Sequence, residues 1–214
     1  MKKEKIILFD LDGTLIDSTE AILESFGVAF SGFGKTVPTN EVIKAQIGYP
    51  LDDMFASMGI TDREIDAYVK AYKYHYRAIS CAKTLLLPQA REAVELAHQH
   101  AILGVVTTKT AKYSIELLEH KGLMGYFDVL IGREDVINPK PHPEPIQKAL
   151  SQLPKVTSGC WMIGDTCMDM DSAKAANIDK MAVLCGYASC EQLSKCASEI
   201  YANAYEAVQN IVTG

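Results

Sequence analysis

The chain has 214 residues, of which 48% are hydrophobic and 22% are charged, values that are ordinary for a globular protein. Its net charge is −6, and its lysines and arginines do not gather in one run, which argues against a nucleic-acid or anionic-membrane partner. No apolar run approaches the roughly 18 residues of a membrane helix, and no signal peptide is recognisable. We therefore expect a cytoplasmic protein. We also expect it to be a monomer or a homodimer.

The six cysteines form no CxxC pair and show no Cys/His spacing that is typical of a metal site. Cysteines in a reducing compartment stay reduced. We therefore expect six free thiols at Cys81, Cys160, Cys167, Cys185, Cys190 and Cys196.

The first predicted element is the apolar run IILF at residues 6–9, which leads directly into Asp10, Leu11 and Asp12. A continuous apolar run is typical of a strand that is buried on both faces. An ionised carboxylate is costly in such surroundings, so the two acids require compensating groups nearby. Alternation along the strand places Asp10 and Asp12 on one side of the chain.

Residues 16–83 carry helical signals and no convincing strand. Possible capping boxes at 17–20 and 61–64 predict helices that run to about residues 30 and 80. The segment interrupts a pattern of strands and therefore reads as an insertion. We predict two domains, an α/β core formed by residues 1–15 and 84–214 and a helical insertion at 16–83.

Short apolar runs alternate with helical patterns along the rest of the chain. Such alternation predicts right-handed βαβ units around a parallel sheet. The predicted strands lie at 102–106, 127–131, 160–163 and 181–185, and the predicted helices at 88–99, 110–121, 142–152, 166–176 and 203–212.

Polar side chains follow these runs at the edge where open parallel sheets bind their ligands, beyond the carboxyl ends of the strands. We expect them to gather there as one site. They are Asp10 and Asp12 after the first run, Thr107 and Thr108 after the second, Lys140 in a proline-rich loop, Asp165 after the run CWMIG, and Asp169 and Asp171 in the helix that follows.

The residue types at this edge suit phosphoryl transfer assisted by a metal. Mg²⁺ favours hard oxygen ligands, and with Lys140 it would compensate several acids in one pocket. One carboxylate can attack phosphorus while a second acts as general acid and then base. Gly13 frees the backbone to turn its N–H groups toward a phosphate, and Thr107 and Lys140 are placed to hold the other phosphoryl oxygens.

The motifs DLDGT, VVTTK, KPHPEP and GDTCMD, in this order, resemble those of the haloacid dehalogenase superfamily of phosphohydrolases. Within it the chain most resembles the phosphoglycolate phosphatase-like branch, and the tail segment GYASCEQL is similar to a stretch after that branch's last core strand. The resemblance implies a Rossmann-like, doubly wound parallel sheet in which the insertion at 16–83 is a helical cap that selects the substrate.

The resemblance also implies individual roles. Asp10 would be the nucleophile that becomes the aspartyl-phosphate, and Asp12 would protonate the leaving group and then activate water. Mg²⁺ would be bound by the Asp10 carboxylate, the Asp12 backbone carbonyl and Asp165, while Asp169 orients a metal-bound water. The phosphoryl group would be held by Thr107, Lys140, Gly13 and the backbone N–H of Thr108, which stands where the family often has asparagine.

The expected substrate is a small phosphorylated metabolite. A phosphoglycolate-like phosphomonoester is the first candidate and inorganic pyrophosphate the leading alternative, while a phosphosugar mutase or sugar phosphatase reaction is less favoured. A nucleotide is a further possible substrate that the sequence leaves open. A signalling receiver groups similar residues but lacks the helical insertion. A catalytically silent protein that binds Mg²⁺ or a metabolite is the alternative from another class.

Overall fold

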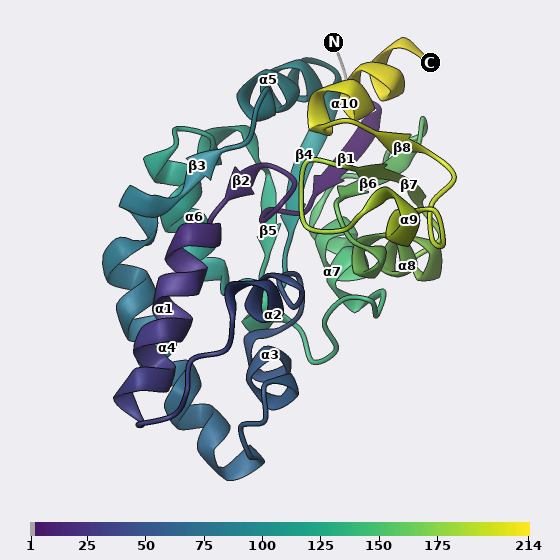
Figure 1. Ribbon diagram of the computed structural model, residues 1–214. Coiled ribbons are helices and arrows are strands. Elements are labelled where there is room, and N and C mark those ends of the chain that lie inside the picture. The colour runs from purple at the N-terminus through teal and green to yellow at the C-terminus, as the bar shows by residue number, and fades with distance from the viewer. Residues whose placement is uncertain (1–2) are drawn as a thin grey trace. The chain divides into compact units, whose positions relative to one another are not determined.

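The computed structural model describes residues 3–214, which form two compact units. One unit comprises the described residues up to Asp17 together with Leu86–Gly214, and the other comprises Ser18–Leu85 (Figure 1). None of the described helices has the length and apolar character needed to cross a membrane.

The first unit is built on a six-stranded sheet with the order β5-β4-β1-β6-β7-β8. Every pairing in it is parallel, and Phe9 at the end of β1 is level with Val105 of β4 and Ile163 of β6. The predicted α/β class with a parallel sheet is therefore confirmed. The strands are β1 (Lys5–Phe9), β4 (Ala101–Val106), β5 (Val129–Ile131), β6 (Cys160–Gly164), β7 (Asp179–Val183) and β8 (Ile200–Tyr201).

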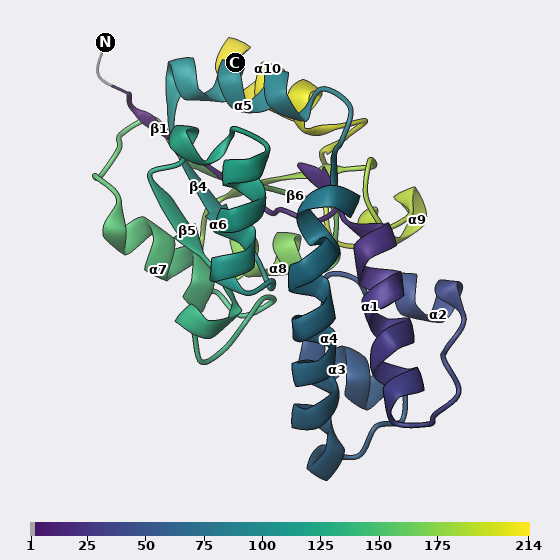
Figure 2. The ribbon, with the colours of Figure 1, turned by 90° about the vertical axis from the view of Figure 1, so that its left-hand side faces the viewer.

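Helices cover both faces of this sheet. In both views α5 and α10 lie above the sheet, and α7 and α8 lie below it (Figure 2). The longer helices of this unit are α5 (Ala90–His100), α6 (Ala111–His120), α7 (Glu144–Gln152), α8 (Cys167–Ala175) and α10 (Ala204–Thr213). Shorter elements are η1 (Met124–Tyr126), η2 (Arg133–Asp135) and α9 (Cys190–Leu193).

The two-sided cover explains why β1 shows no alternation of apolar and polar residues. Ile6 and Leu8 belong to an apolar cluster that includes Ile146 of α7 and Ala173 of α8. Ile7 and Phe9 are completely buried and, by the alternation of a strand, face the opposite side of the sheet. Each such side chain stabilises the fold by roughly 1.5–3 kcal/mol, so β1 anchors whatever follows it.

The second unit is entirely helical, apart from Leu85 at its end, and consists of α1 (Thr19–Gly32), α2 (Asn40–Lys44), α3 (Leu51–Ser57) and α4 (Asp62–Lys83). Its core is aromatic: the ring centroids of Phe26 and Phe55 are 4.7 Å apart, and those of Phe30 and Tyr68 are 5.4 Å apart. Tyr68, Tyr72 and Tyr76 are buried along one face of α4.

Both capping boxes differ from the sequence-based prediction. Helix α1 begins at Thr19 with Ser18 as its N-cap, because Ile16–Asp17 form the short strand β2. Thr61 is the N-cap of α4, but its hydroxyl donates to the Glu64 carboxylate at 2.7 Å instead of accepting a backbone N–H. The helices were therefore predicted correctly, whereas their capping contacts were not.

The connecting segments lie side by side. Strand β2 pairs with β3 (Leu85–Leu86) in a separate two-stranded sheet, and the Leu87 N–H donates to the Leu15 carbonyl at 3.0 Å. The helical unit spans Ser18–Leu85, close to the insertion predicted at 16–83. That it acts as a cap stays a prediction.

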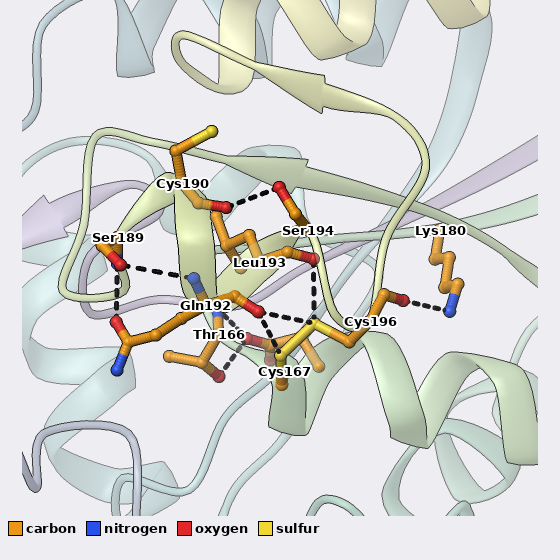
Figure 3. Close-up of a disulfide and its surroundings, with 10 residues drawn as sticks. Thr166, Cys167, Lys180, Ser189, Cys190, Gln192, Leu193, Ser194 and Cys196 are labelled. Carbon is orange, nitrogen blue, oxygen red and sulfur yellow. Dashed lines mark hydrogen bonds between the residues drawn. A yellow bond between two sulfur atoms is a disulfide. The ribbon is translucent and has the colours of Figure 1, made fainter.

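The expectation of six free thiols is wrong. Cys167, the first residue of α8, forms a disulfide with Cys196, which follows α9 (Figure 3). The two residues are 29 positions apart, and only the packing of the segment after β7 against the start of α8 brings them together. No local sequence pattern signals such a pair. Cys81, Cys160, Cys185 and Cys190 are free.

Candidate active site

The turn after β1 positions the two predicted acids. The Asp10 N–H still donates to Ile163 O at 2.9 Å, as in the sheet, and the chain then turns at Gly13, whose φ is +84°. That left-handed conformation favours glycine. Asp10 and Asp12 are 5% and 8% exposed. Both carboxylates are thus held at the carboxyl edge of the central strand.

The Lys140 ammonium group contacts residues from three different elements of the site. Its Nζ donates to Asp10 Oδ1 at 2.7 Å, to Asp169 Oδ1 at 2.6 Å and to the Val106 carbonyl at 2.9 Å. The side chain is 4% exposed, although lysine is rarely buried unless it is paired. The ammonium group therefore joins the ends of β1 and β4 to the first turn of α8.

Asp165 and Asp169 complete an acidic cluster with Asp10. One carboxylate oxygen from each of the three residues lies within 4.8 Å of the others. The Tyr187 N–H donates to Asp165 Oδ2 at 2.8 Å, and the Thr14 hydroxyl lies 3.4 Å from Asp165 Oδ1. A buried cluster of carboxylate oxygens at this spacing could hold a cation.

Both oxygens of Asp169 already have partners. Its Oδ2 accepts from the backbone N–H and the hydroxyl of Thr166, at 3.1 and 2.8 Å, while Oδ1 faces Lys140. This arrangement fits a supporting role better than direct metal coordination. Asp171, the competing acid of the same helix, is exposed.

Burial and mutual repulsion alter the acidity of these groups. Burial raises the pKa of Asp10 to about 7, although the positive charge of Lys140 opposes the shift. Burial and the charges of Asp10 and Asp169 raise the pKa of Asp165 well above its usual range. Burial lowers the pKa of Lys140, but Asp10 and Asp169 outweigh it, so the net shift is upward and the lysine stays charged.

A second lysine, Lys109, was missed by the sequence analysis. Its Nζ lies 3.0 Å from Asp12 Oδ2, and both side chains are 11% exposed. Its backbone N–H donates to the Thr107 hydroxyl at 3.2 Å. The segment VVTTK was singled out for its threonines, and nothing in the sequence indicates that the lysine after them faces an acid.

Two glycines permit the close approach of Asp165 to the backbone. A Cβ at Gly13 would lie 2.3 Å from Asp165 Oδ2, and one at Gly186 would lie 2.0 Å from the same atom. Gly186 and Tyr187 were not predicted as site residues. The signal that could have found them is the segment GYASCEQL, because it follows the last long strand of the sheet.

The contacts described above bring together four of the predicted site residues, namely Asp10, Lys140, Asp165 and Asp169. Asp12 lies near enough for its charge to raise the pKa of Asp10. Thr107, which is buried, and Thr108 follow β4 at the same sheet edge, and Gly13 follows Asp12. The contacts of these three residues with a phosphate stay predictions.

Comparisons with known proteins settle the family. Residues 7–183 match the family described as haloacid dehalogenase-like hydrolase. The chain belongs to this family. A crystal structure described as a haloacid dehalogenase-like hydrolase from Bacteroides fragilis has a TM-score of 0.88 at 28% identity, covering 96% of this chain and 100% of that one.

Several relatives carry names that specify an activity, among them a phosphoglycolate phosphatase and a pyrophosphatase. The phosphoglycolate phosphatase of Colwellia psychrerythraea is 29% identical over 197 residues, which are 87% of this chain and 87% of that protein. The pyrophosphatase PpaX of Halalkalibacterium halodurans is 35% identical over 185 residues, covering 85% of this chain and 83% of that protein. The protein is thus a phosphatase of the haloacid dehalogenase-like family.

Proposed function

We propose that the protein is a Mg²⁺-dependent phosphatase that hydrolyses a small phosphomonoester through an aspartyl-phosphate on Asp10. The observation that carries this proposal is the position of the Asp10 carboxylate, 2.7 Å from the Lys140 ammonium and in one cluster with Asp165 and Asp169. A nucleophile that attacks an anionic phosphate needs positive charge beside it, and this edge of the sheet supplies it.

The two carboxylates divide the chemistry. A carboxylate oxygen of Asp10 attacks phosphorus, and the bond from phosphorus to the leaving-group oxygen breaks while Asp12 gives that oxygen its proton. In the second step Asp12 takes a proton from water, whose oxygen attacks the aspartyl-phosphate. Phosphate leaves and Asp10 is restored. Lys140 holds Asp10 in place and balances negative charge on the transferring group.

The acidic cluster fits Mg²⁺. Asp10, Asp12, Asp165 and Asp169 carry four formal negative charges, of which Lys140 and Lys109 compensate two. Asp10 and Asp165 offer hard oxygen donors, as Mg²⁺ prefers, and Asp169 would orient a water beside it. The bound ion would supply the missing positive charge and a fixed point for a phosphoryl oxygen.

The substrate class is proposed from the named relatives. A phosphoglycolate-like monoester is the first candidate, because 87% of the chain matches a phosphoglycolate phosphatase. Pyrophosphate is the second candidate, since the relative named as a pyrophosphatase is 35% identical. We propose that the helical unit Ser18–Leu85 acts as the cap that selects between them. A cytoplasmic location and a monomeric or dimeric state stay predictions.

The test compares Asp10→Asn with Asp171→Asn, a matched change at an exposed acid. Phosphate release from phosphoglycolate, pyrophosphate and p-nitrophenyl phosphate is measured with Mg²⁺ and with a chelator. We expect the wild type and Asp171→Asn to be active only with Mg²⁺, and Asp10→Asn to lose activity by at least about 1000-fold.

Labelled phosphate bound to the protein, and released by hydroxylamine, should appear with the wild type and be absent from Asp10→Asn. Normal turnover by Asp10→Asn would refute the mechanism. Failure of the wild type on a broad panel of phosphorylated metabolites, despite bound Mg²⁺, would favour a silent binding protein.

A further inference from the structure

The ion pair between Lys109 and Asp12 has no part in the proposed steps. The Lys109 ammonium lies 3.0 Å from Asp12 Oδ2, and only 11% of each side chain is exposed. Removing a lysine side chain from water is costly unless its charge is paired, and Asp12 provides that pairing. The steps proposed above use Asp12 but give Lys109 no role beyond neutralising it.

The loop that carries Lys109 is fixed on both sides of the residue. The Lys109 N–H donates to the Thr107 hydroxyl at 3.2 Å, and its carbonyl accepts from the Arg133 N–H at 3.0 Å. Thr110 then forms the N-cap of α6. A short segment anchored in this way presents its side chain in one place, as a specificity residue must.

The buried Lys140 and the partly buried Lys109 stand beside different carboxylates. Lys140 contacts Asp10, the group that attacks phosphorus, and so lies beside the phosphoryl group that is transferred. Lys109 contacts Asp12, the group that gives its proton to the leaving oxygen. Because Asp12 must reach that oxygen, a cation 3.0 Å from Asp12 stands next to the leaving group.

We propose that Lys109 is a specificity-determining residue that favours leaving groups carrying a negative charge of their own. This inference rests on the proposed function, since it takes Asp12 as the acid that serves the leaving group. The second phosphate of pyrophosphate and the carboxylate of phosphoglycolate both provide such a charge. A neutral alcohol, such as a sugar hydroxyl, provides none and gains nothing from the lysine.

A purely positional role makes a different prediction. If Lys109 only holds Asp12 in place, its removal slows proton transfer to every leaving group and lowers kcat for all substrates alike. If Lys109 also contacts a charged leaving group, its removal acts more strongly on the substrates that carry one, and it raises their KM as well as lowering kcat. The ratio between two matched substrates separates the two roles.

The experiment compares phosphoglycolate with 2-hydroxyethyl phosphate, in which a neutral hydroxymethyl group replaces the carboxylate. Pyrophosphate is the third substrate. Lys109→Met removes the charge and keeps the length, Lys109→Arg keeps the charge, and Lys112→Met removes an exposed lysine of α6 as the control. All four proteins are assayed with saturating Mg²⁺.

Because Lys109 also contacts Asp12, Lys109→Met should slow all three substrates. We expect the loss of kcat/KM to be about 30-fold greater for phosphoglycolate and pyrophosphate than for 2-hydroxyethyl phosphate. Lys109→Arg should retain most of the preference, and Lys112→Met should match the wild type. The ratio of the two kcat/KM values is independent of the folded fraction, so partial misfolding of a variant does not blur the result.

Equal losses on charged and neutral substrates would overturn the proposal in favour of a positional role. Unchanged kinetics of Lys109→Met would overturn it as well. A wild type that hydrolyses no phosphate ester with Mg²⁺ would overturn the proposed function and this inference together, whereas an active wild type with an unchanged ratio in Lys109→Met overturns the inference alone.

Discussion

Reduction of the Cys167–Cys196 disulfide should destabilise the α/β unit by an amount that follows from its position in the chain. The bond closes a loop across a sequence separation of 29 residues. In the unfolded chain such a cross-link removes conformational entropy, worth about 3.6 kcal/mol at 25 °C for a loop of this size. For a unit of about 150 residues, this corresponds to a fall in Tm of about 10 °C.

The single tryptophan of the chain, Trp161, makes the assay specific to this unit because it lies in β6. Unfolding in urea is followed by its fluorescence, with and without dithiothreitol, so that the helical unit does not contribute to the signal. Thiol titration of the denatured protein should detect four thiols before reduction and six after it. The titration establishes that the bond was formed and then broken.

Cys196→Ala is the matched control, since it lacks the disulfide under both conditions. Its free energy of unfolding should equal that of the reduced wild type within about 1 kcal/mol and should not respond to dithiothreitol. Equal midpoints for the oxidised and reduced wild type, with the thiol titration as expected, would refute the reasoning. A drop of similar size in Cys196→Ala on adding dithiothreitol would assign the effect to the reductant.

Three further predictions concern the site and the helical core. Gly186→Ala should lower activity at least 10-fold, because its Cβ would lie 2.0 Å from Asp165 Oδ2, whereas Gly27→Ala, in open space on α1, should be neutral or stabilise the protein by up to about 1 kcal/mol. Tyr68→Phe should raise the free energy of unfolding of the helical unit by about 1 kcal/mol, since the buried Tyr68 hydroxyl has no hydrogen-bond partner among residues 3–214. A loss of stability would show that the hydroxyl has a hydrogen-bond partner. Adding Mg²⁺ at about 100 times its Kd should stabilise the wild type by about 2.7 kcal/mol in thermal unfolding, and an equal gain in Asp165→Asn would argue against this residue as a ligand.

The strands and helices of the α/β unit could be predicted because burial requires apolar residues at regular positions along each element. The run at residues 6–9 has to be apolar throughout, since helices cover both faces of the sheet. Strand β8 escaped prediction because two residues, Ile200–Tyr201, leave no periodic pattern to detect. Asp17 was assigned to a helix cap because the pairing of Ile16–Asp17 with β3 depends on a segment almost 70 residues away.

The site was predicted as far as residue type and strand ends could indicate it. Asp10, Asp12 and Asp165 follow apolar runs, and Asp169 lies in the first turn of a helix. Lys140 lies in the proline-rich loop ahead of α7. The position of Lys109 beside Asp12 depends on how the loop after β4 meets the turn after β1. The contact between Tyr187 and Asp165 joins segments 22 residues apart. Such contacts are set by tertiary packing and leave no trace in local spacing.

Asp169 links the assembly of the site to the folding of a helix. One of its oxygens caps the first turn of α8 through Thr166, and the other binds the Lys140 ammonium. The helix cannot start in its native register without placing that carboxylate, and Lys140 cannot be fully paired until the helix has docked. During refolding, the return of activity should therefore coincide with the docking of α8, so turnover reports when that part of the chain reaches its native packing.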